Sequence, residues 1–187
     1  MKILSKHFIG GIFLILIGGT LVFAQTEKQI DAIKKIYAET GEKIKECEEN
    51  GEYSLVFLSQ FSVNKNSGSY PAVGIFNSVF KFYYTYGDRE KNPYPDRLLK
   101  INVETKRSNR VEYSEYLFDP AGKLIFYFEK NDADAERRVY FSAEKPIRSL
   151  SGEKAANLNS REEIEMVKAI LKEKGKLALM FQNSLRY

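Results

Sequence analysis

The sequence predicts an α+β fold in which an antiparallel meander sheet of about six strands carries an N-terminal and a C-terminal helix packed on one face. Apolar residues recur every three or four positions near both ends of the chain, as on the buried stripe of an amphipathic helix. Between these stretches apolar and polar residues alternate and short turn sequences intervene, which is typical of strands joined by hairpins. Such a sheet offers one face for helices to cover.

The first helix is expected after Gln25, where Ile30, Ile33 and Ile44 recur at helical spacing among Lys and Glu residues. Gly51 marks its end, because glycine readily takes the backbone conformation that terminates helices. The last helix begins at Ser160 and Glu163, which match the S-x-x-E capping box. An apolar stripe from residue 164 to residue 181 follows this box.

The strands are expected where the two-residue alternation is strongest. Asp119, Pro120 and Gly122 occupy the positions that a type I turn prefers, so the flanking segments should form a hairpin. Pro146 favours an edge position for the last segment, because proline cannot donate to a neighbouring strand. The predicted strands are 53–63, 72–86, 98–105, 111–118, 124–130, 138–142 and a short edge strand within 145–151.

Residues 1–24 are predicted to be a secretory signal peptide, which leaves residues 25–187 as a single domain. Lys2 and Lys6 precede an apolar run from Phe8 to Phe23, and Ala24 precedes the expected cleavage site. The run is shorter than the ~20 residues that usually span a bilayer, so no stable membrane anchor is expected after cleavage. A leader that is retained as an anchor stays open as the alternative.

Composition excludes several kinds of chemistry. His7, in the leader, is the only histidine, so the mature domain has no imidazole for a Ser-His-Asp or Cys-His site. Cys47 is the only cysteine, which excludes an internal disulfide and zinc sites built on several cysteines. We therefore expect no catalytic residues, no metal and no cofactor. The 29 basic and 25 acidic residues nearly balance, and two of the basic ones lie in the leader, so nucleic acid is not an expected partner.

Alternation along the strands divides their side chains between two faces. The predicted core face carries mainly aromatic and aliphatic residues, namely Phe80, Phe82, Tyr84, Tyr86, Ile101, Val103, Leu124, Phe126, Phe128, Val139 and Phe141. The opposite face mixes tyrosines with charges and is predicted to be a shallow binding platform. Its candidate binding residues are Lys81, Tyr83, Lys100, Tyr116, Tyr127, Glu129, Arg138 and Tyr140.

The segment YLFDPAGKLIFYFE resembles the tyrosine–aspartate hairpin of exported bacterial repeat proteins and YwqK-type repeats, through Tyr116, Asp119, Gly122, Lys123 and Leu124. Most of the mature chain, with its charged first helix and aromatic meander, is similar to small exported bacterial proteins of unassigned function. This resemblance implies a non-enzymatic envelope protein and assigns no site residues. An NTF2-like or cystatin-like half-cone is an alternative arrangement of the same elements.

These observations favour an exported, soluble, non-enzymatic binding or accessory protein of the bacterial envelope, periplasmic or secreted, whose partner is a protein or an envelope polymer. One alternative is a carboxylate-dependent glycan hydrolase that uses two residues of the set Glu104, Glu112, Glu115 and Glu129. Another is a self-associating structural protein that forms a homodimer through its sheet face.

Cleavage of the leader can be tested on the protein recovered from the cell that makes it. We expect intact-mass and N-terminal measurements to give Gln25 as the first residue, because the apolar run ends at a signal-peptidase pattern. A mass that includes residues 1–24 would contradict this prediction and favour the retained anchor.

Overall fold

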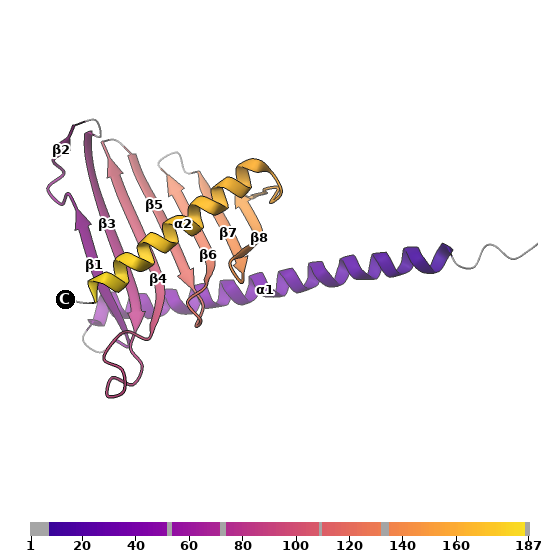
Figure 1. Cartoon of the computed structure of the whole chain (residues 1–187), viewed down its shortest axis with the longest axis horizontal. Helices are drawn as coiled ribbons and strands as arrows, with labels where there is room; N and C mark the ends of the chain where they lie inside the picture. The colour runs from indigo at the N-terminus through magenta and orange to yellow at the C-terminus, as the bar shows by residue number, and fades with distance from the viewer. Residues whose placement is uncertain (1–7, 52–53, 72–73, 109, 132–134, 186–187) are drawn as a thin grey trace, which may run out of the picture.

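Antiparallel strands form a sheet with one helix on each face in the computed structural model of the chain (Figure 1). The structure describes residues 8–51, 54–71, 74–108, 110–131 and 135–185, and side chains from residue 25 onward. Residues 53 and 72–73, at the starts of two predicted strands, and the first seven residues of the predicted leader lie outside the described residues. The elements are α1 (Phe8–Asn50), β1 (Val56–Val63), β2 (Ser69–Tyr70), β3 (Gly74–Thr85), β4 (Arg97–Arg107), β5 (Arg110–Phe118), β6 (Leu124–Asn131), β7 (Glu136–Ser142), β8 (Lys145–Ser151), β9 (Lys154–Ala155) and α2 (Arg161–Ser184).

The sheet is a meander with the strand order β1-β3-β4-β5-β6-β7-β8-β9, and β2 pairs separately with β3. The predicted α+β class and antiparallel sheet are confirmed, with nine strands among the described residues in place of about six. The predicted turn is also present, because the Asp119 carboxylate accepts from the amides of Ala121 and Lys123 at 2.9 and 2.8 Å. Gly122 has a φ of 74°, a conformation that glycine adopts without strain.

The two helices lie on opposite faces of the sheet, so the prediction that both pack on one face is wrong (Figure 1). α2 places Val167 and Phe181 in a cluster with Phe82 of β3. α1 places Ile30 in a separate cluster with Leu117 of β5. The strands carry apolar side chains on both faces, and each apolar face must be covered by another layer.

Bulges explain why simple alternation misassigned some residues. The register between β5 and β6 shifts between Leu117 and Phe118, so Leu124 packs toward α2 whereas Phe126 and Phe128 pack toward α1. The sequence prediction placed these three β6 residues on one core face. A one-residue shift turns every following side chain to the other face, and alternation alone does not reveal where it occurs.

α1 extends the predicted first helix toward the N-terminus, since it begins at Phe8, and its N-terminal part runs past the margin of the sheet (Figure 1). Among the residues whose side chains are described, from residue 25 on, no helix is both long and apolar enough to cross a membrane.

A buried carboxylate fastens α1 to the sheet. Glu115 of β5 forms an ion pair with Lys100 of β4 at 2.9 Å, and both side chains are 8% exposed. The two oxygens of this carboxylate also accept hydrogen bonds from Tyr37 of α1 at 2.7 Å and from Tyr113 at 2.6 Å. The Lys100 ammonium lies 4.6 Å from the centre of the Tyr37 ring, a cation–π distance. One helix residue therefore completes a charged cluster that belongs to the sheet.

Two further contacts hold the ends of the part of α1 that covers the sheet. Glu48 accepts hydrogen bonds from Lys81 at 2.8 Å and from Tyr83 at 2.7 Å, and these donors lower the pKa of the Glu48 carboxyl. Near the other end, Arg148 of β8 donates to Glu27 at 3.1 Å. α1 is thus positioned along its length by polar contacts as well as by apolar packing.

Replacing Glu115 with Gln should lower the free energy of unfolding by about 3–5 kcal/mol, because the change leaves the Lys100 charge buried without a counter-charge. Urea denaturation at neutral pH measures this loss. The matched control is Glu104→Gln, whose ion pair with Lys106 at 3.1 Å is solvent-exposed and should change stability by less than about 1 kcal/mol. Equal losses in the two variants would contradict the role given to Glu115.

Candidate functional site: a cleft between α2 and the central strands

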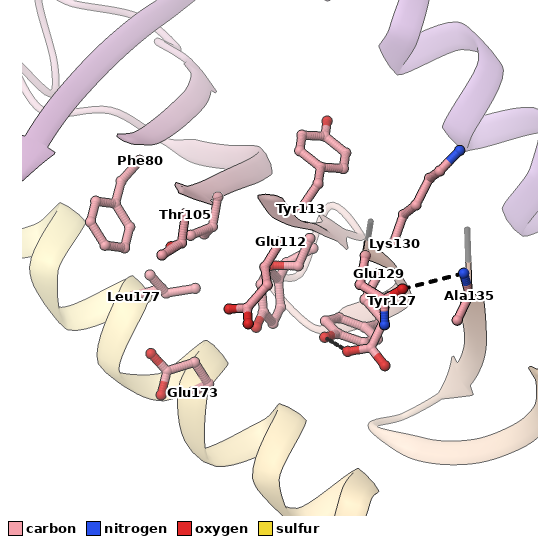
Figure 2. A pocket seen from close by; sticks show the side chains of 14 residues that line it. Phe80, Thr105, Glu112, Tyr113, Tyr127, Glu129, Lys130, Ala135, Glu173 and Leu177 are labelled. Carbon is pink, nitrogen blue, oxygen red and sulfur yellow. Dashed lines mark hydrogen bonds between the residues drawn. The ribbon is translucent and has the colours of Figure 1, made fainter. Parts of the chain in front are cut away.

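A cleft of about 360 Å³ opens on the α2 face of the sheet, between that helix and strands β4 to β6 (Figure 2). α2 crosses the sheet diagonally, so it leaves part of this face uncovered (Figure 1). The lining residues are Phe80, Val103, Thr105, Glu112, Tyr113, Ser114, Tyr116, Tyr127, Glu129, Lys130, Asn131, Ala135, Glu173 and Leu177. The volume falls within the range of small-molecule sites in proteins.

Apolar and aromatic side chains form one part of the lining. Phe80 and Val103 are paired on adjacent strands, and Leu177 of α2 lies near Phe80 (Figure 2). The rings of Tyr116 and Tyr127 meet edge-to-face with 5.0 Å between their centres, an arrangement that favours aromatic pairs. Packed apolar and aromatic side chains therefore form the base of the cleft, beneath its polar groups.

Three carboxylates surround the opening, Glu112 of β5, Glu129 of β6 and Glu173 of α2 (Figure 2). Each lies in an ion pair with a neighbouring cation. The pairs are Arg107 with Glu112 at 3.5 Å, Arg137 with Glu129 at 3.5 Å and Lys176 with Glu173 at 2.8 Å. A carboxylate has about four acceptor positions, so these contacts leave each group able to accept further hydrogen bonds.

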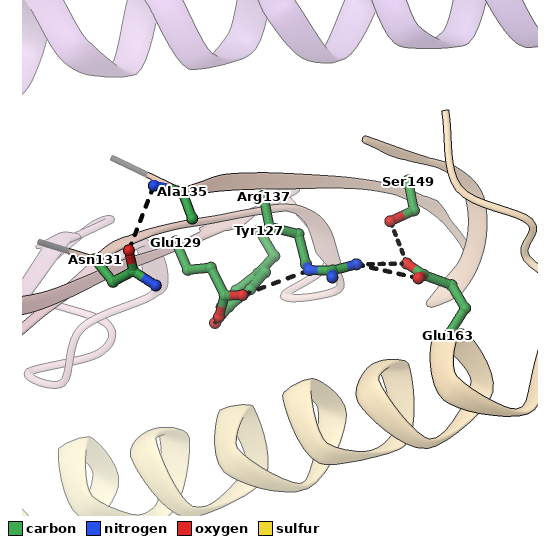
Figure 3. Close-up of polar contacts among 7 residues, drawn as sticks. All are labelled: Tyr127, Glu129, Asn131, Ala135, Arg137, Ser149 and Glu163. Carbon is green, nitrogen blue, oxygen red and sulfur yellow. Dashed lines mark hydrogen bonds and ion pairs between the residues drawn. The ribbon is translucent and has the colours of Figure 1, made fainter. Parts of the chain in front are cut away.

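A chain of polar contacts orients Glu129 within the cleft (Figure 3). The Tyr127 hydroxyl donates to one oxygen of Glu129 at 2.6 Å, and Arg137 of β7 contacts the other. Arg137 also donates to both oxygens of Glu163 at 3.0 and 3.1 Å, and Ser149 of β8 donates to the same carboxylate. Glu163 is 4% exposed, so this series of polar contacts ends at a buried carboxylate at the start of α2.

Glu163 shows what sequence reasoning missed at this site. The predicted capping box is confirmed in one half, because Ser160 accepts from the Glu163 amide at 3.3 Å. The Glu163 side chain instead binds Arg137 and Ser149, which lie on strands of the sheet. The S-x-x-E spacing signalled Glu163, but only the packing of α2 on the sheet could reveal these partners.

Burial controls the ionisation of the two tyrosines in the cleft. Burial raises the pKa of Tyr116 to about 12. Burial, the neighbouring Tyr116 and the hydrogen bond to Glu129 raise the pKa of Tyr127 well above its usual range. Both phenols are therefore neutral hydrogen-bond donors under physiological conditions.

The predicted binding residues do not share one open face. Tyr116, Tyr127 and Glu129 line the cleft on the α2 side. The other five lie on the α1 side, so the predicted single platform is wrong. Lys81 and Tyr83 contact Glu48 of α1, Lys100 contacts Glu115, and Arg138 and Tyr140 line a separate pocket beside Tyr37.

Burial also removes most of these residues from an exposed surface. Tyr83 is 1% exposed and Tyr140 is 6% exposed, because α1 covers the face that the sequence prediction left open. Tyr116 and Tyr127 are likewise only 4% and 6% exposed at the base of the cleft. The four glutamates considered for hydrolysis divide in the same way. Glu112 and Glu129 line the cleft, whereas Glu115 is buried against α1 and Glu104 lines a pocket on that side.

Within the described part of the chain, no group of three or more His, Cys, Asp or Glu side chains is arranged to hold a metal ion. The lining of the cleft offers carboxylate acceptors, phenol hydroxyls and ring surfaces, and the Tyr127 hydroxyl is already engaged with Glu129.

Comparisons with known proteins find no matching family model, curated sequence or solved structure for this chain. The resemblance of the hairpin around Gly122 to YwqK-type repeats stays a prediction.

Ionisation of Tyr116 should make stability depend on pH in the alkaline range. The folded state favours the neutral Tyr116 phenol. The contribution of Tyr116 to the unfolding free energy is therefore complete below about pH 10, the pKa of an unfolded tyrosine, and declines as the pH rises toward 12. Relative to Tyr116→Phe, the wild-type protein should lose roughly 1 kcal/mol of unfolding free energy between pH 9 and pH 11. Urea denaturation across this range measures the difference, which should stay constant from pH 7 to pH 9. A parallel decline in both proteins would show that Tyr116 is not the group responsible.

Proposed function

We propose that this protein is an exported, non-enzymatic binding protein of the bacterial envelope, and that the cleft beside α2 binds an envelope glycan. The observation that supports this proposal is the set of three carboxylates, one of them oriented by the Tyr127 hydroxyl, around a base of apolar and aromatic side chains. Sites for small polar ligands combine apolar and aromatic walls with a few placed hydrogen-bonding groups.

The ligand is a polyhydroxylated chain in preference to a cationic peptide. Glu112, Glu129 and Glu173 each have a cation within 3.5 Å, so their charge is largely compensated. Sugar hydroxyls donate to carboxylates without requiring a net negative site, and the apolar faces of sugar rings can lie against aromatic side chains. The polar lining thus suits neutral hydrogen-bond donors.

The predicted leader supports export, and the single histidine within it supports a role without imidazole-based catalysis.

A glycan hydrolase is the second candidate, because Glu112 and Glu129 approach each other on one face. Glu112 is opposite Asn131, and Glu129 is opposite Ser114, which makes the two glutamates diagonal neighbours whose backbone positions lie roughly 7–8 Å apart. Inverting glycosidases use a pair of carboxyl groups on one face with room for a water molecule between them.

The binding proposal can be tested with soluble oligomers of β-1,4-linked N-acetylglucosamine as the probe. Glu173→Gln should weaken binding about ten-fold or more, because a hydrogen bond to a charged group contributes roughly 1.5–3 kcal/mol. Isothermal titration calorimetry measures the change. Glu165→Gln is the matched control, since both glutamates lie on α2 in exposed pairs with a lysine three residues later, and only Glu173 faces the cleft.

Chromatography of the oligomers after incubation separates the two candidates. Intact oligomers that bind the wild type but not Glu173→Gln support a binding protein. Shortened products that the wild type forms and Glu129→Gln does not, while Glu129→Gln still binds the oligomers, would instead support the hydrolase. Equal affinity of Glu173→Gln, Glu165→Gln and the wild type would overturn the proposed cleft.

A further inference from the structure

One margin of the sheet ends in a strand with an unusual composition. β1 is the first strand in the order of the sheet and pairs with β3 on one side only (Figure 1). Its eight residues, VFLSQFSV, include no charged residue and no proline. Its register with β3 runs without a shift from Val56 to Val63, so no bulge twists it away from solvent. An outer strand of this kind presents a row of backbone donors and acceptors to any strand that approaches.

The opposite margin has the features that normally prevent strand pairing. It ends in β9, which has only two residues, Lys154 and Ala155. The preceding strand, β8, begins with Lys145 and Pro146. Short strands, lysines and prolines are recognised protections of sheet edges. The two margins of one sheet thus differ in their protection.

Exposed apolar side chains gather at the unprotected margin. Among the residues whose side chains are described, nine large apolar side chains are exposed, and five of them belong to β1, its flank or the short β2–β3 pair that continues the margin (Figure 1). These five are Leu55, Leu58, Val63, Tyr70 and Ile75, with Leu55 85% exposed. A gathering of exposed apolar groups beside an open strand marks an interaction surface.

We infer that β1 pairs antiparallel with β1 of a second copy of this chain. An uncharged strand offers no complement to a charged partner, whereas it is self-complementary about a two-fold axis at Ser59. This register keeps every residue on its own face of the joined sheet and sets Phe57 opposite Phe61 of the other copy. Both phenylalanines already pack on the α2 side, so the aromatic row would continue from one sheet into the next.

The pairing also extends the apolar contact beyond the strand itself. In the same register Leu55 lies opposite Val63 of the second copy, and both are exposed in the single chain. Leu58 lies opposite Gln60 on the α1 side. The dimer would therefore cover three exposed apolar side chains on each copy. It would also give hydrogen-bond partners to the backbone N–H and C=O groups of β1 that point away from β3.

The test uses the protein as recovered from the cell and measures its mass by analytical ultracentrifugation over a wide concentration range. The wild type should be a dimer that dissociates reversibly. The double variant Leu58→Lys with Gln60→Lys places two lysines opposite each other across the axis, and like charges in this position oppose pairing. It should weaken the dimer at least ten-fold, and circular dichroism should show that the monomer keeps its fold because both positions are exposed.

The matched control is Leu179→Lys, which adds charge at an exposed apolar residue of α2 and should leave the dimer unchanged. A wild type that stays monomeric at high concentration would overturn the inference, as would a dimer that the double variant does not weaken. Neither result bears on glycan binding, because none of these three substituted residues lines the cleft.

Discussion

The position of α1 on the sheet depends on the buried carboxylate of Glu115. Lys100 supplies its counter-charge, and hydrogen bonds from Tyr37 and Tyr113 occupy both oxygens. A buried ion pair contributes little net stability, whereas an incomplete one is strongly destabilising, so the cluster selects one arrangement in preference to others. Tyr37 completes this cluster from α1, and Glu27 and Glu48 hold the two ends of the part of the helix that covers the sheet.

α1 and α2 cover the two faces of the sheet through different contacts, and the candidate site lies on the face that α2 covers. α1 covers its face with charged contacts from Glu27 to Glu48, which hold the helix along the sheet. α2 packs through an apolar stripe, and its start is tied to the sheet by Glu163 and Arg137 (Figure 3). The same guanidinium reaches Glu129, so the contact that fixes α2 also orients a carboxylate of the cleft. Fold and site therefore share one polar chain.

Local patterns predicted the elements well because they depend on neighbouring residues. The turn at Asp119, the start of α2 at Ser160 and the alternation of the central strands are each encoded within a few residues. The sequence placed Phe126 on the wrong face of the sheet, because the register between β5 and β6 shifts at a bulge and turns this side chain toward α1. Three members of the cleft, Tyr116, Tyr127 and Glu129, were among the predicted binding residues, but five others were assigned to the same surface in error.

Spacing and composition are properties of the chain, so they were enough to predict the fold class, the order of helices and strands, and the absence of histidine from the predicted mature domain. Three features could be learned only from the folded molecule: the helices cover opposite faces, Arg137 joins Glu129 to Glu163, and β1 is the outermost strand at one margin of the sheet. These features depend on strand register and on side chains far apart in sequence, where a one-residue shift reverses which face a residue occupies.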